Sequence, residues 1–179
     1  MPSPTTPSAA RSTSPLAVRR ATADDRPLLE RLWLLFRHDL SGLTGTLPRA
    51  DGTFRSERLD SALADRGWAA FVGFMGEAPV GFAFVRNLDR SPRVLNSFFV
   101  VAGARRAGVG SALVDEVLRT VPGRWEIAFQ GHNTPAVRFW RRTAARHDPD
   151  WGEELRPVPG DPHAAPDAWV TFDVPGPHH

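Results

Sequence analysis

The amino-acid sequence predicts one α/β (α+β) domain, a mixed β-sheet flanked by helices. Its 179 residues are a length typical of a single domain. Short runs rich in Val, Phe and Ala occur between longer segments whose leucines and valines recur at helical spacing. Because both kinds of segment are interleaved along the chain, helices packed on a sheet are favoured over an all-helical or an all-strand domain.

The first half of the chain predicts one strand, two helices and a three-stranded meander. Thr22 or Asp24 caps the first helix, and Pro27 suits its first turn. Gly76 and Glu77 form the short turn of a hairpin. The predicted elements are, in order, a strand at 16–20, a helix through 28–40, a loop at 41–52, a helix at 54–65, and strands at 68–75, 79–86 and 93–101.

The second half of the chain predicts two further helices and three strands. Leu113, Val114, Val117 and Leu118 share one side of the first of these helices, as expected for a helix packed on a sheet. Pro135 stands at the start of the second helix, where its fixed φ is tolerated. The predicted elements are a helix at 108–121, a strand at 124–130, a helix at 134–146, and strands at 151–158 and 168–174.

The two ends of the chain are predicted to lie outside the domain. Residues 1–15 are rich in Pro, Ser and Thr, and we expect them to form a disordered tail. The domain spans 16–174, and 175–179 form a short C-terminal tail. The N-terminal residues lack the apolar core of a secretory signal, and the sequence has no apolar run near ~20 residues. We therefore expect neither secretion nor association with a membrane.

The amino-acid composition excludes several kinds of catalytic and metal-binding residues. The sequence has no Cys, which excludes disulfides, thiolate metal ligands and a cysteine nucleophile, and which suits a reducing, cytoplasmic location. All 22 basic residues are Arg and Tyr is absent, so a lysine Schiff base and a tyrosine acid are excluded as well. No spacing of His, Asp and Glu is typical of a metal site. The arginines are scattered and the net charge is only +2, which predicts no nucleic-acid partner.

A glycine-rich turn between a strand and a helix is the most informative segment. After the strand that ends near Val101, the chain runs Arg105-Arg106-Ala107-Gly108-Val109-Gly110-Ser111. Free backbone N–H groups and the helix dipole at such a turn form a site suited to phosphate. The dinucleotide fingerprint would need a third glycine where Leu113 stands, and the Walker motif would need a lysine. A turn that is glycine-rich only for structural reasons stays an alternative.

This turn and the strand–helix unit after it together resemble the GNAT superfamily of N-acetyltransferases. The family's pyrophosphate motif is Arg/Gln-x-x-Gly-x-Gly/Ala, and its next helix often carries Asn-x-x-Ala-x-x-Phe-Tyr. The resemblance implies a twisted, mostly antiparallel sheet whose fourth and fifth strands, here 93–101 and 124–130, splay apart to hold acyl-CoA. The sequence also looks like an uncharacterised bacterial subgroup of predicted acetyltransferases, which implies no particular substrate. The matching residues are Arg105, Gly108, Gly110, Asn133, Ala136 and Phe139, with Trp140 where Tyr is usual.

The resemblance also implies acetyl-CoA as co-substrate and a set of residues around it. Pantetheine would pair with the edge of the fourth strand, the N–H of Val100 would polarise the thioester carbonyl, and the turn would bind the pyrophosphate. Asn133 is placed like the family's cofactor-contacting Asn, and Trp140 is expected to pack against the cofactor or the core. The implied cofactor-binding residues are Phe99, Val100, Val101, Arg105, Arg106, Ala107, Gly108, Val109, Gly110, Ser111, Asn133, Phe139 and Trp140.

Trp140 cannot replace the family's tyrosine acid. The candidates for catalytic residues therefore lie at the end of the fifth strand, on the first helix and on the fourth strand. His132 can accept a proton near pH 7, and a surface or capping role is the alternative. Asp39, near the end of the first helix, would face the acceptor or else belong to a helix-terminal polar pair. Ser97, beside Asn96, can order a water molecule but is not a strong base.

We therefore predict transfer of an acetyl group from acetyl-CoA to a primary amine of a small molecule, by direct attack in a ternary complex. From residue 147 onward there are seven acidic residues and one arginine, which favours a cationic acceptor or is simply a solvated surface. Acetylation of a protein N-terminus or lysine and a non-catalytic acyl-CoA sensor are the alternatives. The six tryptophans suit the core or the interface of a homodimer.

Overall fold

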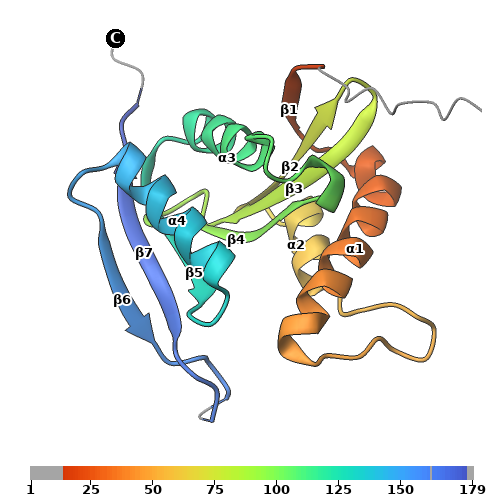
Figure 1. Ribbon diagram of the computed structural model, residues 1–179. Coiled ribbons are helices and arrows are strands. Elements are labelled where there is room, and N and C mark those ends of the chain that lie inside the picture. The colour runs from red at the N-terminus through yellow and green to blue at the C-terminus, as the bar shows by residue number, and fades with distance from the viewer. Residues whose placement is uncertain (1–13, 162, 177–179) are drawn as a thin grey trace, which may run out of the picture.

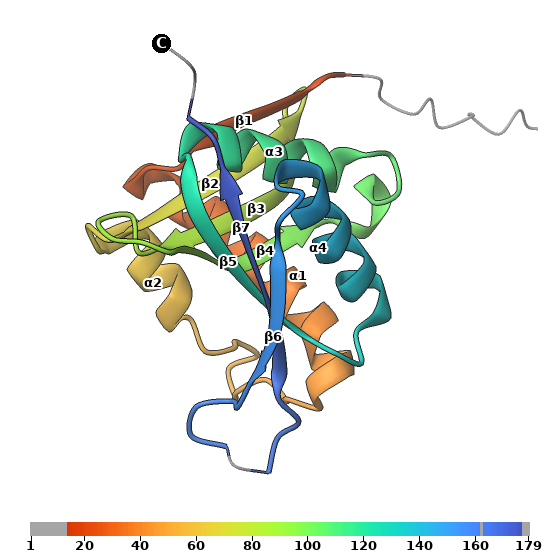
Figure 2. The same cartoon turned by 90° about the vertical axis from the view of Figure 1, so that its left-hand side faces the viewer.

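The protein folds into a seven-stranded sheet with helices on both faces (Figure 1 and Figure 2). The computed structural model describes residues 14–161 and 163–176, so residues 1–13 of the expected N-terminal tail lie outside the described residues. The strands follow the order β1-β2-β3-β4-β5-β7-β6 across the sheet. Every neighbouring pair is antiparallel except β4 and β5, which are parallel. The predicted fold class, a mostly antiparallel mixed sheet flanked by helices, is confirmed.

Seven strands, four α-helices and two short 3-10 helices, η1 and η2, make up the described part of the chain. Their bounds are β1 Leu16–Arg20, η1 Ala23–Asp25, α1 Arg26–Thr44, α2 Glu57–Ala64, β2 Trp68–Met75, β3 Ala78–Arg86, β4 Arg93–Val100, η2 Ala102–Ala104, α3 Val109–Thr120, β5 Gly123–Gln130, α4 Thr134–His147, β6 Gly152–Arg156 and β7 Asp167–Val174.

The first helix is longer than its sequence predicts. We expected a loop from Ser41, but α1 continues to Thr44. The residue that ends it is Gly45, which adopts a left-handed conformation (φ 67°) and donates its N–H to the carbonyl of Ser41 (2.8 Å). A helix commonly ends at a glycine in this conformation, and the polar residues before it do not prevent the last turn from forming. The loop that we predicted at 41–52 therefore begins at Gly45, four residues later than expected.

The remaining differences are also confined to the ends of elements. The second helix begins at Glu57 rather than Phe54, and Ser56 precedes it as its N-cap residue. β6 ends at Arg156, before the predicted end at 158, because Pro157 has no N–H to continue the ladder. The predicted hairpin is confirmed, since Met75 pairs with Ala78 across the two-residue turn.

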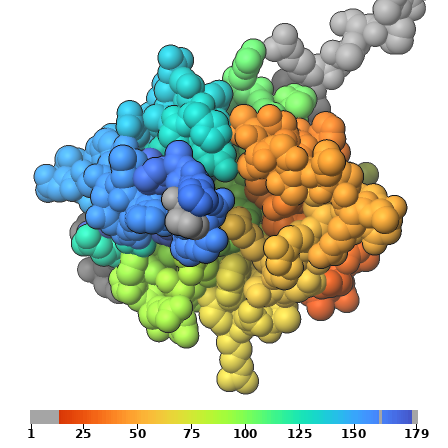
Figure 3. Space-filling view, turned by 90° about the horizontal axis from the view of Figure 1, so that it is seen from below, coloured from red at the N-terminus to blue at the C-terminus, as the bar shows by residue number. Residues whose placement is uncertain are grey.

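The sheet carries a hydrophobic core on each of its faces. On β3, Phe82 and Phe84 pack beneath α1 and α2, whereas Ala83 and Val85 face the core beneath α3 and α4. This alternation follows from the period of two along a strand. The buried residues of β5 and β7 belong to the α3–α4 core alone. In the described part of the chain, no helix covers the opposite face of β5 and β7 (Figure 1). The surface is hollowed between these C-terminal strands and the α1–α2 segment, and we call this hollow the cleft (Figure 3).

Within the same described residues, none of the helices combines the length and the apolarity that crossing a lipid bilayer requires.

Candidate active site

The two parallel strands at the centre of the sheet diverge part-way along their length. β4 pairs with β5 only from Arg93 to Leu95, whereas β5 pairs with β7 over all eight of its residues. Beyond Leu95 and Ile127 the two strands no longer form a ladder, so the rest of β4 borders an open gap. The register of β4 against β3 shifts at the same point, because Phe84 pairs with Ser97 and Val85 with Leu95. The expected splay between the fourth and fifth strands is confirmed.

The ladder on the other side of β4 determines which backbone groups point into this gap. Val101 donates its N–H to the carbonyl of Val80 on β3 (2.8 Å). Hydrogen-bonded pairs alternate along an antiparallel ladder, so the N–H groups of Phe99 and Val101 point toward β3. The N–H groups of Phe98 and Val100 therefore point toward the gap. Backbone groups at such an edge need another partner, and an extended amide-containing ligand supplies one.

The start of α3 presents a second set of free donors. The first hydrogen bond within this helix runs from the N–H of Ala112 to the carbonyl of Gly108 (3.0 Å). The N–H groups of Val109, Gly110 and Ser111 precede it and find no acceptor among the described residues, and no side chain caps the helix. Together with the helix dipole, these donors form a site for an anion such as a pyrophosphate.

The turn before α3 owes its curvature to two left-handed residues. Arg106 has φ 66° and Gly108 has φ 78°. This conformation suits glycine and is strained for arginine. A strained loop at a helix N-terminus is common where the backbone binds a ligand, because the strain orients its N–H groups. Gly108 also has open space around it, so a ligand has room to approach the backbone.

An aromatic cluster joins β4 to α4 beside the gap. The ring of Phe98 stacks on Phe139 with 5.6 Å between their centroids and meets Trp140 edge-on at 5.1 Å. Trp140 is buried in the core, whereas Phe98 and Phe139 keep part of their surface exposed. Gly110 of α3 packs against this cluster, since a Cβ there would be 3.5 Å from the Phe139 ring. Of the aromatic pair on α4, Phe139 is thus the one with surface left for a ligand.

The side chain of Arg105 turns away from the open turn and toward α1. Its Nε donates to the carbonyl of Val100 (2.8 Å), its guanidinium lies over the Phe99 ring, and it forms an ion pair with Asp39. Asp39 and Arg105, which we predicted separately as a base and a phosphate contact, are therefore bonded to each other. Any contact of Arg105 with a pyrophosphate would come from its backbone, and Asp39 is not free in this arrangement.

The remaining predicted residues lie around the end of β5 and the divergence of the strands. Asn133 is the N-cap of α4, and its side chain accepts the N–H of Ala136 (3.3 Å). His132 is exposed in the turn before it. Ser97 is buried where β4 leaves β5, and its hydroxyl donates to the side chain of Asn96 (3.3 Å). Whether these residues contact substrate stays a prediction.

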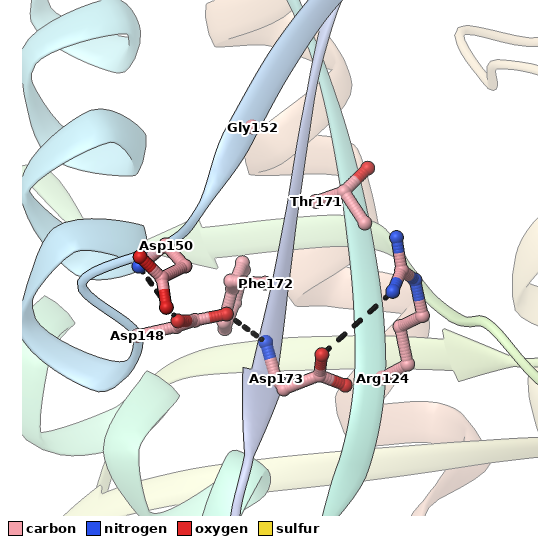
Figure 4. Close-up of a pocket in the computed structure, with 7 residues that line it drawn as sticks. All are labelled: Arg124, Asp148, Asp150, Gly152, Thr171, Phe172 and Asp173. Atoms are coloured by element: carbon pink, nitrogen blue, oxygen red, sulfur yellow. Dashed lines mark hydrogen bonds and ion pairs between the residues drawn. The ribbon is translucent and has the colours of Figure 1, made fainter.

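Three of the seven acidic residues in the last quarter of the chain form ion pairs with arginines. Glu153 forms a bidentate ion pair with Arg141 of α4 (2.7 Å), which lowers the pKa of its carboxyl. Asp148 accepts the backbone N–H of Asp173 (2.9 Å), and Asp173 faces Arg124 across a polar hollow of about 160 Å³ (Figure 4). Glu153, Glu154 and Asp173 are thus compensated by arginines, whereas the other acidic residues of this segment form no ion pair within the described residues. A preference for a cationic acceptor stays a prediction.

Two features of the structure carried no signal in the sequence. Phe98 belongs to the aromatic cluster beside the gap, but a phenylalanine in a strand usually packs in the core. The charges of Arg37 on α1 and Arg86 on β3 also act on Arg58 of α2. Because these three residues lie in separate segments and belong to no motif, only the tertiary structure brings them together.

The sequence matches one family across most of the domain. The model of the "Acetyltransferase (GNAT) family" matches residues 29–144, which is well over half of the chain. The chain belongs to this family. It is therefore an acyltransferase, and acetyl-CoA is its acyl donor. The residues present fit that donor, because the GNAT domain has both the gap beside β4 and the uncapped N-terminus of α3.

Solved structures of other acetyltransferases share the fold of this GNAT domain. An acetyltransferase from Thermus thermophilus is 18% identical with a TM-score of 0.65, covering 92% of this chain and 100% of its own. The ribosomal-protein-S18-alanine N-acetyltransferase of Escherichia coli is 13% identical with a TM-score of 0.59, covering 89% and 94%. An aminoglycoside acetyltransferase from an uncultured soil metagenomic sample, in complex with trehalose, is 18% identical with a TM-score of 0.56, covering 72% and 86%.

These likenesses are to the fold and do not identify the acceptor, since they include enzymes named for a protein and for an aminoglycoside. Among curated proteins, none matches this sequence. In the part of the chain that the structure describes, no group of three or more His, Asp or Glu residues is arranged to hold a metal ion.

Proposed function

We propose that this GNAT protein acetylates the primary amine of a small molecule by direct attack on acetyl-CoA within a ternary complex. The observation that carries the proposal is the gap beside β4, into which the N–H of Val100 points. The cleft between the C-terminal strands and the α1–α2 segment favours a small acceptor, because the protein encloses it on both sides (Figure 3). An acceptor entering there approaches β4 on the face of the sheet that carries Ser97.

The reaction forms a C–N bond and breaks the C–S bond of the thioester. In the proposed arrangement the N–H groups of Val109, Gly110 and Ser111 bind the pyrophosphate, and the edge of β4 pairs with pantetheine. The N–H of Val100 then donates to the carbonyl oxygen of the acetyl group, on which negative charge develops as the amine attacks. Because the chain has no Cys, a cysteine acyl-enzyme is excluded and direct transfer is favoured.

Proton transfer is assigned to the residues near the end of β5 and the divergence of β4. The amine must lose a proton, and His132 or a water molecule held by Ser97 and Asn96 is proposed to accept it. The thiol of CoA has a pKa not far above that of cysteine, which is about 8.5, so the thiolate can leave without an acid. The buried Trp140 is proposed as a packing residue, since an indole N–H is not an acid at this pH.

The first experiment measures the melting temperature with and without saturating acetyl-CoA. We expect a rise of roughly 5–10 °C when the ligand is at about 100 times its dissociation constant. The variant Gly110→Asp places a carboxylate at the start of α3, where it satisfies the free N–H groups and repels a phosphate. Its Cβ is tolerated at 3.5 Å from Phe139. The variant should keep the melting temperature of the free protein and lose the shift.

Gly103→Asp is the matched control, because it adds the same charge in η2 where the position has open space. This control should keep the acetyl-CoA shift. Release of the CoA thiol is then followed with a panel of amines and with peptide N-termini. A shift without thiol release from any amine would favour the sensor, and no shift would contradict acetyl-CoA binding at this site.

The remaining expectations concern assembly and location. We propose a homodimer, which the exposed Leu34, Leu35 and Leu43 on α1 support as apolar surface. Light scattering after size exclusion tests it, and a monomeric mass at working concentration would contradict it. We also propose a cytoplasmic location without nucleic-acid or membrane partners, for which the absence of Cys and the scattered arginines are the support.

A further inference from the structure

The boundary between α3 and α4 runs above the gap between β4 and β5. α3 packs on β1, β3 and β4, whereas α4 packs on β5 and β7, so the two helices cover the two sides of the gap (Figure 1, Figure 2). A Cβ at Gly110 would lie 3.5 Å from the Phe139 ring, and Nε2 of His147 lies 2.9 Å from a carboxylate oxygen of Asp115. Because the residue numbers of both helices rise in the same direction, their N-terminal ends lie side by side.

One edge of α4 faces α3. Phe139 contacts the start of α3, and Arg146 forms an ion pair with Asp115. Residues three and four apart on a helix share one side, so Arg142 lies on this edge between Phe139 and Arg146. On α3, the residue one turn before Asp115 is Ser111, whose N–H is one of the free donors at the helix start. Arg142 therefore lies beside the N-terminal end of α3.

Arg142 differs from its neighbours on the edges of α4 because it has no partner. Arg141 is paired with Glu153, and Arg146 is paired with Asp115. Arg142 is exposed and forms neither an ion pair nor a hydrogen bond with a described residue. The dipole of α3 gives its N-terminal end a positive potential, which repels a guanidinium beside it. An anion between the helix start and the guanidinium would turn this repulsion into two attractions.

The arginine of the glycine-rich turn does not fill this role with its side chain. Arg105 is bonded to the carbonyl of Val100 and to Asp39, on the side of β4 that α1 covers. Acetyl-CoA, the donor of this family, carries a pyrophosphate and a further phosphate on the 3′ position of its ribose. A guanidinium suits either group, because its planar N–H pairs match two oxygen atoms at once.

We propose that Arg142 binds a phosphate group of acetyl-CoA together with the free N–H groups at the start of α3. The proposal rests on the donor position given under the proposed function, and it assigns a donor-binding side chain on α4. It replaces the expected side-chain contact of Arg105 with one from a different helix.

Three ligands that differ in their phosphates test the proposal by titration. Dephospho-CoA lacks the 3′-phosphate of CoA, and pantetheine lacks every phosphate. Arg142→Gln should weaken the binding of CoA roughly tenfold, the size of one charge-assisted hydrogen bond. The binding of pantetheine, measured up to millimolar concentration, should be the same in both proteins. An equal loss for CoA and dephospho-CoA assigns Arg142 to the pyrophosphate, and a loss for CoA alone assigns it to the 3′-phosphate.

Turnover gives a second readout. The phosphates take no part in the bonds that form and break, so Arg142→Gln should raise the KM for acetyl-CoA roughly tenfold and leave kcat unchanged. Higher salt should reduce the difference between wild type and variant, because it screens exposed charges. Arg142→Lys should recover part of the affinity, since it restores the charge without the paired N–H groups.

Arg138→Gln is the matched control. Arg138 lies one turn earlier on α4, is also exposed and forms no bond with a described residue, but it lies outside the edge between Phe139 and Arg146. This variant should change the affinity for CoA by less than about threefold, as expected for an exposed charge without a direct contact. Both variants should keep the melting temperature of the free protein, which shows that they fold.

Three results would overturn the proposal. The first is an Arg142→Gln variant that binds CoA as the wild type does. The second is an equal loss of pantetheine binding, which would show that Arg142 only supports the packing of α4. The third is an equal loss in Arg138→Gln, which would show a diffuse effect of charge. If CoA does not bind the wild type at all, the result would instead contradict the proposed position of the donor.

Discussion

Gly81 and Gly108 lack side chains for different physical reasons. A Cβ at Gly81 would lie 2.3 Å from the backbone carbonyl oxygen of Phe99, so β3 and β4 approach too closely there for any other residue. Gly108 has open space around it but a φ of 78°, so its constraint is conformational. The first glycine therefore maintains the strand that borders the gap, and the second maintains the turn that begins α3.

Alanine at these positions should destabilise the protein to different degrees. Gly81→Ala should lower the free energy of unfolding by about 2–3 kcal/mol, because backbone must move to relieve the contact. Gly108→Ala should cost about 1 kcal/mol from the left-handed conformation alone. Gly42→Ala, within α1 and without neighbours, should be stabilising by about 0.5–1 kcal/mol. Urea denaturation measures all three, and an equal loss at Gly81 and Gly42 would contradict the close contact.

Variants of Asp39 and Arg105 distinguish a positioning role from a catalytic role. Removing a general base costs about 10²- to 10⁴-fold in rate and changes the pH profile. Because Arg105 holds Asp39 and the carbonyl of Val100, we expect Asp39→Asn to lower kcat/KM less than tenfold with the pH profile unchanged. Arg105→Ala should raise the KM for acetyl-CoA more, since it leaves the Val100 carbonyl unpaired. A flattened pH profile in Asp39→Asn would instead identify Asp39 as the base.

At the scale of secondary-structure elements, the link from β1 to α1 depends on one carboxylate. Asp25 accepts the backbone N–H of Thr22 (2.8 Å) and two guanidinium N–H groups of Arg19 (2.6 and 2.7 Å). The hydrogen bonds from Arg19 contribute most to lowering the pKa of Asp25 to about 2. These bonds connect the first strand of the sheet to the start of the helix that covers it.

Asp25→Asn should therefore destabilise the protein in a pH-dependent way. The folded-state pKa lies below the ordinary value of 3.8, so the contribution is present above about pH 4 and is lost as the pH falls through 2. Arg19 is half exposed, so we expect about 1 kcal/mol at neutral pH. The difference in melting temperature between wild type and variant should shrink toward pH 2. Asp24→Asn, one residue earlier, is the control, and a difference independent of pH would contradict the role of the Asp25 charge.

At the scale of the whole molecule, the sheet consists of two parts joined by a short parallel ladder. β1 to β4 form one part and β5 to β7 the other, and only three residue pairs connect them. The uncapped end of α3 and the aromatic cluster beneath it lie beside the resulting gap. A ligand that pairs with β4 in this gap completes the sheet where the protein leaves it open.

Hydrogen exchange along β4 should report this completion. Without ligand, the amides of Phe98 and Val100 point into the gap and should exchange faster than those of Phe99 and Val101, which pair with β3. Acetyl-CoA should slow exchange at Val100 strongly and at Phe99 little. Equal protection of all four amides in the free protein would contradict the strand register. Equal protection of the four amides with acetyl-CoA bound would also contradict the proposed position of pantetheine.

The sequence by itself determined the features that depend on neighbouring residues. Periodicity predicted nearly every strand and helix, and Gly108 and Gly110 marked the turn that begins α3, because a left-handed residue and a helix start are local properties. Errors such as the late end of α1 are also local, since several residues near Gly45 could have ended that helix.

Only the tertiary structure decided which distant groups meet. It paired Asp39 with Arg105 across 66 positions, buried Trp140 while leaving Phe139 partly exposed, and paired Glu153 near the acidic end of the chain with Arg141. Charge in a sequence is counted along the chain, whereas its effect on a substrate depends on which charges remain unpaired at the surface that the fold creates.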